Sequence, residues 1–446
     1  MIGIIMFVFA LLFLVLGYSV AFTFGAVSMI FGAIAAWIEV MGDGGTLMEF
    51  YDEFLSMFSM MPFRIYSIMT NKILMAVPLF IFMGIVLQKS KLAERLLLSM
   101  GTMFGKVRGG LAISTVLIGA LLAASTGVVG ASVVAMGVIS LPVMLQNSYN
   151  KALSCGTICA AGTLGQIIPP SIVLIILADV FGLPVGDLFK KAMMPGFILV
   201  FVYILYILFI SYIDKSVAPA MKIDKSKDKK QNIKDALLAI IPPLALIVMV
   251  LGSIFLGIAT PTESASLGAI GSVILALIYK SFNLNLLKEA SLETVKTTSM
   301  VFAILVGATA FSMVFVYSEG DLVVEQFLTH LPGDKWGFII FSMLVITFLG
   351  FFIDFIEISY IVVPILLPIS QTIGIDPLWF AILIALNLQT SFLTPPFGFS
   401  LFYLKGVAPS SVKSTDIYKG VVPFILIQIL VLASIVIFPS FYGFKG

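Results

Sequence analysis

Two acidic residues interrupt an otherwise apolar run at Phe351-Phe-Ile-Asp-Phe-Ile-Glu-Ile-Ser359. Asp354 and Glu357 are three positions apart, so a helix would carry both carboxylates on one face. A bare charge inside a bilayer costs roughly 3 kcal/mol or more, so such groups face a cavity, pair with another group or hold a cation. A protonated or hydrogen-bonded carboxyl group is the structural alternative. The sequence favours ion binding here, with Asp354 as the first choice of ligand and Glu357 as the second.

Two double-proline sequences, Pro169-Pro170 and Pro395-Pro396, are the second chemical feature. Consecutive prolines stop a helix, because each lacks an N–H and the second forces the first out of the helical region. The helix before the break is left with unpaired carbonyl groups, and the helix after it with unpaired N–H groups. Carbonyl ends suit Na⁺ and N–H ends suit an anion. At membrane depth such groups are tolerated only beside a cavity or a ligand.

A tract of small residues over positions 123–135 is the third feature. Glycine lets a helix unwind, and the hydroxyl groups of Ser125, Thr126 and Ser132 suit an ion or a carboxylate. Close helix packing is the alternative explanation for small residues in a membrane helix. Further along, Thr260-Pro-Thr-Glu263 is predicted to start a helix, with the carboxylate of Glu263 in its first turn.

These features predict one region for ion and solute. The predicted ion-binding residues are Ser125, Gly127, Gly130, Gly162, Thr163, Asp354, Glu357, Thr394 and Pro395. The predicted substrate-binding residues are Thr126, Ser132, Pro169, Pro170, Ser171, Thr390 and Pro396. No catalytic residue and no transition-metal site is predicted, because the one histidine is His330 and the two cysteines are interpreted as packing residues. We find no Walker A sequence, so any energy must come from an ion gradient or from another subunit.

The elements that position these residues must be membrane helices. The chain has 446 residues, of which 60% are hydrophobic and 11% are charged, whereas soluble domains carry about a quarter charged residues. Backbone groups in lipid must be satisfied within each segment, so we expect about eleven full helical spans plus re-entrant pieces. The first apolar tract is expected to stay in the protein as two spans, with a break near Gly17. A net charge of +2 is too small to favour nucleic acid as a partner.

Loop charge and repeated landmarks indicate two related halves. The basic segments 89–108 and 215–235 are predicted to be cytoplasmic, and the segments 39–53 and 319–335, with few or no basic residues, external. Leu141-Pro142 and Pro169-Pro170 recur at Leu367-Pro368 and Pro395-Pro396, both at an offset of 226 (368 − 142 and 395 − 169). Matching landmarks with opposite loop charge favour an inverted-topology repeat, although chance recurrence among 20 prolines is an alternative.

The predicted organisation has five segments. They are scaffold helices with an external segment (1–71), a first repeat with a hairpin (72–213), a cytoplasmic Lys-rich linker (214–235), further scaffold helices (236–298), and a second inverted repeat with a hairpin (299–446). Lysines give the linker its positive charge. A solvated loop with no linker role is the alternative interpretation of this segment.

The chain resembles the large permease subunit of tripartite ATP-independent periplasmic (TRAP) transporters, the DctM-like family. The matching stretches are Ala76-Val-Pro-Leu-Phe-Ile-Phe-Met-Gly84, Ala124-Ser-Thr-Gly-Val-Val-Gly-Ala-Ser132, Gly162-Thr-Leu-Gly-Gln-Ile-Ile-Pro-Pro-Ser171, Thr260-Pro-Thr-Glu-Ser-Ala265 and Leu386-Asn-Leu-Gln-Thr-Ser-Phe-Leu-Thr-Pro-Pro-Phe-Gly398. They follow the family order over nearly the whole chain. Where family members commonly have Ser-Gly-Ser, this chain has Ser125-Thr-Gly127.

The resemblance implies an all-α polytopic fold, with scaffold helices and a moving transport domain that carries two re-entrant helical hairpins. It also implies an elevator mechanism coupled to Na⁺, with no other cofactor, in the bacterial inner membrane. The implied partners are a small four-helix membrane subunit, a periplasmic binding protein, a small carboxylate substrate and membrane lipid. Three alternatives stay open at this point: a stand-alone carrier of related fold, a membrane subunit of an ion-pumping enzyme, and a structural anchor.

Overall fold

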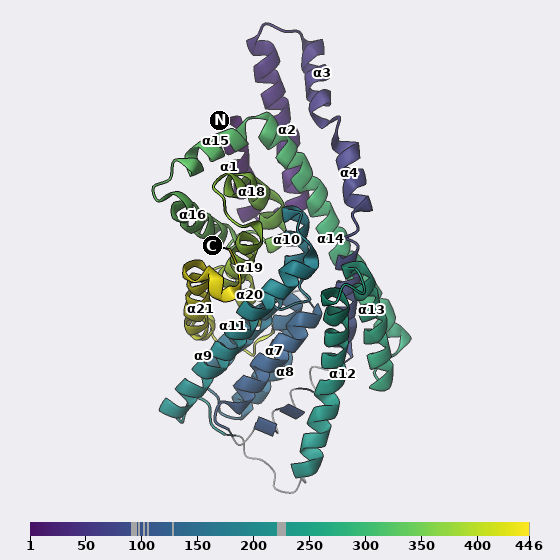
Figure 1. Ribbon diagram of the computed structural model, residues 1–446, viewed down its shortest axis with the longest axis vertical. Helices are drawn as coiled ribbons and strands as arrows, with labels where there is room; N and C mark the ends of the chain where they lie inside the picture. The colour runs from purple at the N-terminus through teal and green to yellow at the C-terminus, as the bar shows by residue number, and fades with distance from the viewer. Residues whose placement is uncertain are drawn as a thin grey trace. The chain divides into compact units, whose positions relative to one another are not determined.

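The computed structural model describes residues 1–90, 96, 99–100, 103–104, 107–126, 129–220 and 229–445, and the regular elements in these ranges are all helices (Figure 1). Two compact units are present. Unit 1 comprises Met1–Leu74 and Lys296–Pro377, and unit 2 comprises Met75–Val295 and Leu378–Gly446. The expectation of an all-α polytopic protein is therefore confirmed.

Seven helices of the described chain are long and apolar enough to cross a membrane. They are Val20–Gly42, Val129–Gln146, Val185–Ile213, Pro261–Ile278, Leu284–Tyr317, Phe355–Thr372 and Ser414–Ile437. Shorter apolar helices accompany them, including Ile2–Val15 and Ala76–Lys89. The expected total of about eleven spans stays a prediction.

Unit 1 begins with two helices separated at a glycine. α1 (Ile2–Val15) ends just before Gly17, whose φ of +90° is accessible to glycine at little cost, and α2 (Val20–Gly42) follows. This is the break expected near Gly17. The unit continues with α3 (Leu47–Phe58), which runs beside α2 (Figure 1), and with α4 (Met61–Thr70).

The rest of unit 1 lies more than 200 residues later in the chain. It contains α14 (Leu284–Tyr317) from Lys296 onwards, α15 (Gly320–Thr329), α16 (Asp334–Leu349), α17 (Phe355–Glu357), the π-helical turn η2 (Ile358–Val362) and α18 (Val363–Thr372). Aromatic rings fill its core, where Phe311 packs against Phe7, Phe24 and Phe315. These contacts join α1, α2 and α14 into one body.

Unit 2 contains the two double-proline segments. Its elements are α5 (Ala76–Lys89), α7 (Gly110–Thr126), α8 (Val129–Gln146), α9 (Lys151–Thr163), the 3₁₀ turn η1 (Leu164–Gln166), α10 (Ile172–Phe181), α11 (Val185–Ile213), α12 (Lys229–Phe255), α13 (Pro261–Ile278), the start of α14, α19 (Pro377–Leu393), α20 (Phe399–Val407), α21 (Ser414–Ile437) and η3 (Pro439–Tyr442). α9 and α21 approach so closely that a Cβ added to Gly156 would lie 2.0 Å from the carbonyl oxygen of Gly420. Only glycine permits this backbone contact.

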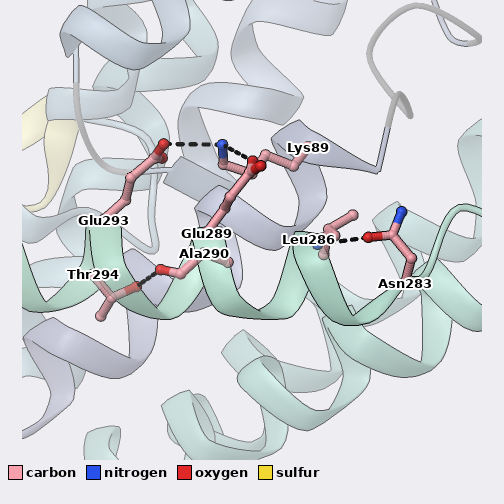
Figure 2. Close-up of polar contacts among 7 residues, drawn as sticks. All are labelled: Lys89, Asn283, Leu286, Glu289, Ala290, Glu293 and Thr294. Carbon is pink, nitrogen blue, oxygen red and sulfur yellow. Dashed lines mark hydrogen bonds and ion pairs between the residues drawn. The ribbon is translucent and has the colours of Figure 1, made fainter.

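Ion pairs connect the start of α14 to α5 within unit 2. Lys89 Nζ lies 3.0 Å from Glu289 Oε2 and 2.9 Å from Glu293 Oε1 (Figure 2). Beside this ion pair, Val86 of α5, Ala276 of α13 and Ala290 of α14 belong to one buried apolar cluster. The boundary between the units falls in α14 just after this fastened part, between Val295 and Lys296.

Helix bounds repeat along the chain at nearly constant spacing. α8 and α17 begin 226 residues apart (355 − 129), as do α9 and α19 (377 − 151). The starts of α7 and α16, of α10 and α20, and of α11 and α21 differ by 224 (334 − 110), 227 (399 − 172) and 229 (414 − 185). Five helical segments therefore recur in the same order, with α17, η2 and α18 together in the place of α8, which supports the repeat that the prolines predicted. The landmarks Pro142 and Pro368 themselves lie inside α8 and α18.

Candidate functional site

Both double-proline segments interrupt helices, as predicted. α9 ends at Thr163, one 3₁₀ turn follows, and α10 begins at Ile172. α19 ends at Leu393 and α20 begins at Phe399. The Pro169-Pro170 and Pro395-Pro396 peptide bonds are both cis. The two breaks thus have the same local form in the two halves of the repeat.

The first break is fully buried and partly satisfied by its own side chains. Ser171 caps α10, because its Oγ accepts the N–H of Leu174 at 3.4 Å and donates to the carbonyl oxygen of Gln166 at 2.8 Å. Thr163 Oγ1 donates to the carbonyl oxygen of Ala160 at 2.9 Å. Pro169 and Pro170 are buried with them. The predicted residues of this break therefore do lie together.

The second break is more open. Thr394 and Pro395 are half-buried, and Pro396 is exposed. Thr394 Oγ1 donates to the carbonyl oxygen of Thr390 at 2.7 Å, and Thr390 Oγ1 donates to that of Leu386 at 3.1 Å. Both hydroxyl groups donate their protons to carbonyl oxygens of the same helix. Each hydroxyl oxygen can therefore still accept a hydrogen bond or contact a cation.

A hydrogen bond joins the two breaks inside unit 2. Gln389 Nε2 donates to Thr163 Oγ1 at 3.4 Å, and the two positions are related by the repeat offset (389 − 163 = 226). Gln389 Oε1 is buried and has no partner among the described residues. Equivalent positions of the two halves therefore meet close to the helix breaks within unit 2.

Gln166 is the residue of this site that sequence reasoning missed. It lies in the 3₁₀ turn before the first double proline and is fully buried. In the described structure neither Nε2 nor Oε1 of its side chain has a hydrogen-bond partner. An unsatisfied buried amide costs about 1–3 kcal/mol, so a ligand, an ion or a water is needed to compensate it. A glutamine in an apolar tract just before Pro-Pro is the signal that would have identified it.

Two glycines predicted as ligands, Gly162 and Gly130, pack closely against neighbouring side chains. A Cβ added to Gly162 would lie 2.4 Å from Val133 Cγ2, and one added to Gly130 would lie 2.8 Å from the ring of Tyr403. Ser132 is buried on α8. Ser125 and Thr126 end α7, but their side chains are outside the described part, as is the whole of Gly127. The predicted tip of the first hairpin therefore stays a prediction.

The predicted acidic pair lies in unit 1, at the start of a short helix. Asp354 is the N-cap of α17, and its Oδ1 accepts the N–H of Phe355 at 2.7 Å. Glu357 ends the same helix and is 2% exposed. A π-helical turn follows at Ile358–Val362, and such turns often occur at functional sites.

Asp354 thus takes a capping role, the hydrogen-bonded alternative that the sequence left open. Glu357 Oε2 and Ser359 Oγ are both buried and have no partner among the described residues. A buried carboxylate oxygen without a partner needs a proton, a water or a cation. Glu357 is therefore better placed than Asp354 to hold an ion in this unit.

Residues 5–441 match the family described as the DctM component of the tripartite ATP-independent periplasmic transporter. A C4-dicarboxylate TRAP transporter large permease protein of Pseudomonas aeruginosa is 31% identical over 82% of this chain and 84% of its own length. The sialic acid TRAP transporter large permease of Vibrio cholerae is 26% identical over 83% of this chain and 85% of its own.

Solved transporter structures share the fold. The YdaH transporter of Alcanivorax borkumensis superimposes with a TM-score of 0.62 at 14% identity, covering 88% of this chain and 90% of its own. MtrF of Neisseria gonorrhoeae gives 0.59 at 10% identity, over 86% and 83%. The chain therefore belongs to the DctM component family of tripartite ATP-independent periplasmic transporters, as a large multi-pass membrane permease and not an enzyme.

Proposed function

We propose that this permease imports a small organic acid across the bacterial inner membrane, driven by Na⁺. The observation that carries the proposal is the pair of broken helices joined by Gln389 and Thr163, with the unsatisfied amide of Gln166 beside them. Broken helices present carbonyl groups that suit Na⁺ and N–H groups that suit an anion. Discontinuous helices of this kind form the binding sites of many secondary transporters.

An organic acid as substrate agrees with the polar groups at the helix breaks and with the substrates in the names of the related permeases. The named relatives transport C4-dicarboxylates, sialic acid and isethionate, which are all anions at neutral pH. The side-chain amide of Gln166 and the backbone N–H groups after each break are suitable donors for such an anion, because the hydroxyl protons at the breaks are already donated to carbonyl oxygens. A bound Na⁺ would offset part of its charge, which favours binding the ion and the acid together.

The proposed partners are a small four-helix membrane subunit and a periplasmic protein that delivers the acid. The family description as tripartite and periplasmic supports them, as does the relative of Oleidesulfovibrio alaskensis named permease protein DctMQ, of which this chain covers 56%. We propose an elevator movement of one part of the chain against the other as the mechanism of transport, in keeping with the repeat and with the two compact units.

Uptake into proteoliposomes tests the proposal. The permease is reconstituted with its small subunit, and the periplasmic protein is added outside with radiolabelled succinate, isethionate or N-acetylneuraminate. We expect one of these acids to accumulate when a Na⁺ gradient is present and not when K⁺ replaces Na⁺. Accumulation without the periplasmic protein would contradict the tripartite arrangement, and equal uptake in K⁺ would contradict coupling to Na⁺.

A further inference from the structure

Unit 1 contains a cavity of about 500 Å³ beside the C-terminal third of α14. Its wall includes Met57 of α3, Met60 just before α4, Arg64 of α4, Ser312 and Tyr317 of α14, and Tyr360 of the π-helical turn. Small-molecule pockets in proteins occupy about 300–1,000 Å³, so a small organic acid fits this volume. None of the site residues predicted from the sequence lines it.

Arg64 brings a positive charge to this wall without a counter-charge. Within the described residues its guanidinium group has no ion pair and no side-chain hydrogen bond; the ion pairs found there are those of Lys89. Arginine stays protonated at any physiological pH and offers five N–H donors in a planar fork. Methionine and aliphatic side chains make up most of the surrounding wall. Arg64 itself is exposed, so an anion that enters the cavity can reach its guanidinium group.

Ser312 offers a second free donor in the same cavity. Thr309 and Ser318, its neighbours on α14, donate to the carbonyl oxygens of Leu305 and Val314 at 2.8 and 2.7 Å. Ser312 Oγ is half-buried and, in the described part of the chain, forms no such bond. Its proton is therefore available to a ligand.

Two acidic residues contact a tyrosine in the wall of this cavity. Tyr317, which also lines the cavity, contacts Glu39 Oε2 at 2.5 Å and Glu53 Oε1 at 2.7 Å through its hydroxyl oxygen. Neither glutamate comes within 4.0 Å of the Arg64 guanidinium, the limit for an ion pair. The two glutamates orient the tyrosine, and they leave the arginine uncompensated.

We propose that Arg64 and Ser312 bind the carboxylate of an organic acid in this cavity. The proposal rests on the function proposed above and adds a specific anion-binding residue to it. The guanidinium fork matches the two oxygens of a carboxylate, and the serine hydroxyl donates a further hydrogen bond to one of them. The methionines of the wall adapt to the carbon skeleton of the acid, because their side chains are flexible and polarizable.

Transport kinetics of arginine variants test this site. The acid used is the one of succinate, isethionate and N-acetylneuraminate that the wild-type complex imports. We expect Arg64→Gln to raise KM for that acid about 10- to 100-fold, the range for losing a charged hydrogen bond. Arg64→Lys keeps the positive charge but loses the planar pair of N–H donors. Its KM should therefore lie between that of the wild type and that of Arg64→Gln. The matched control is Arg108→Gln, because Arg108 lies over the ring of Tyr212, 5.9 Å from its centroid, and should leave KM unchanged.

Chemical labelling provides a test that needs no variant to fold. Phenylglyoxal modifies accessible arginines, and mass spectrometry of the wild-type complex reports the labelling of Arg64. We expect the imported acid to slow this labelling at least about 5-fold, and its neutral amide to leave it unchanged. Equal labelling with and without the acid would overturn the proposal, as would an Arg64→Gln variant with wild-type KM.

Co-purification decides between a ligand and a protein contact. If Arg64→Gln loses the small membrane subunit during affinity purification, Arg64 is a subunit contact and the carboxylate assignment is overturned. Retention of the subunit together with a raised KM supports the assignment. Failure of the wild-type complex to import any acid in a Na⁺ gradient contradicts the proposed function itself, whereas wild-type uptake with an unaffected Arg64→Gln contradicts only this inference.

Discussion

Lys89 and Arg64 are both basic residues in the wall of a cavity, and they differ in what the fold places beside them. Lys89 borders a space of about 580 Å³ in unit 2, and Glu289 and Glu293 neutralise its charge (Figure 2). Arg64 borders a space of about 500 Å³ in unit 1 and has no acidic partner in the described chain. The first cation fastens two helices together, and the second is available to a ligand.

The same contrast separates the buried amides of unit 2. Gln428 Nε2 donates to the hydroxyl of Tyr203 at 2.9 Å, so its nitrogen is satisfied, while its Oε1 has no partner among the described residues. Gln166 has no partner at either side-chain atom within the described residues. A polar group that the protein satisfies itself contributes to the fold, whereas one left unsatisfied has a cost that a ligand removes. This difference distinguishes structural polar groups from candidate binding groups.

The largest effect is expected when Arg64 is given the counter-charge that Lys89 already has. Ser312→Asp places a carboxylate in the wall of the same cavity, where we expect it to offset the charge of Arg64 and to repel an incoming anion. We expect kcat/KM for the imported acid to fall at least about 100-fold. The measurement is the initial rate of uptake into proteoliposomes against acid concentration.

Ser312→Asn is the control for that variant, because it has nearly the shape of aspartate without the charge. Its kcat/KM should fall by less than about 10-fold. Equal losses in the two variants would mean that bulk, and not the pairing of Arg64, stops transport.

A smaller effect is expected from removing the unsatisfied amide of unit 2. Gln166→Leu removes a buried amide that destabilises the ligand-free protein and that can form hydrogen bonds to a bound ligand. We expect the free energy of unfolding to rise by about 1 kcal/mol, while KM for Na⁺ or for the acid rises about 10-fold. Thermal unfolding of the purified protein and uptake kinetics provide the two readouts.

Gln428→Leu is the matched control. Gln428 is as buried as Gln166, but its Nε2 donates a hydrogen bond to Tyr203. It should lower the stability of the protein and leave both KM values unchanged. A Gln166→Leu variant that is stabilised and still transports normally would exclude Gln166 from the binding site.

Breaking the ion pair of Lys89 should alter stability alone. Lys89→Met leaves Glu289 and Glu293 without their cation, and these three side chains are 25%, 61% and 51% exposed. Partly exposed ion pairs contribute about 1 kcal/mol or less, so the melting temperature should fall by only a few degrees. KM for the acid should match the wild type, and a rise like that of Arg64→Gln would remove the contrast between the two cations.

The smallest effect is expected from Glu293→Gln, which leaves Lys89 with one acidic partner at 3.0 Å. The free energy of unfolding should fall by less than about 0.5 kcal/mol, since Glu289 keeps the charge paired. Melting curves in low salt measure the difference, and a loss as large as that of Lys89→Met would show that Glu293 alone makes the pair.

Local features of the fold follow from short stretches of sequence. Gly17 and the double prolines act on their own backbone and immediate neighbours, so the helix ends near them are predictable. The start of α13 is equally local: Thr260 and Glu263 form the expected N-terminal cap, with Thr260 N–H donating to Glu263 Oε2 at 2.8 Å. The prolines also revealed the repeat, because one spacing recurs at two pairs of landmarks.

The candidate site was only partly predictable for the same reason. The sequence identified the polar tracts at both helix breaks, but it assigned ligand roles to Gly130 and Gly162, where the structure shows tight packing. It gave no role to Gln166, whose importance depends on which neighbours are missing. Whether a polar atom is satisfied is a property of its surroundings, and residue type alone does not contain it.

By itself, the sequence determined that this protein is a helical membrane permease with interrupted, repeated helices, because hydropathy and helix-stopping residues act over a few turns of backbone. Only the tertiary structure decided that Gln389 meets Thr163 across 226 residues, that Lys89 is paired, and that Arg64 has no ion-pair partner among the residues that the structure describes. Such pairings depend on which helices pack together, and packing is set by the whole chain.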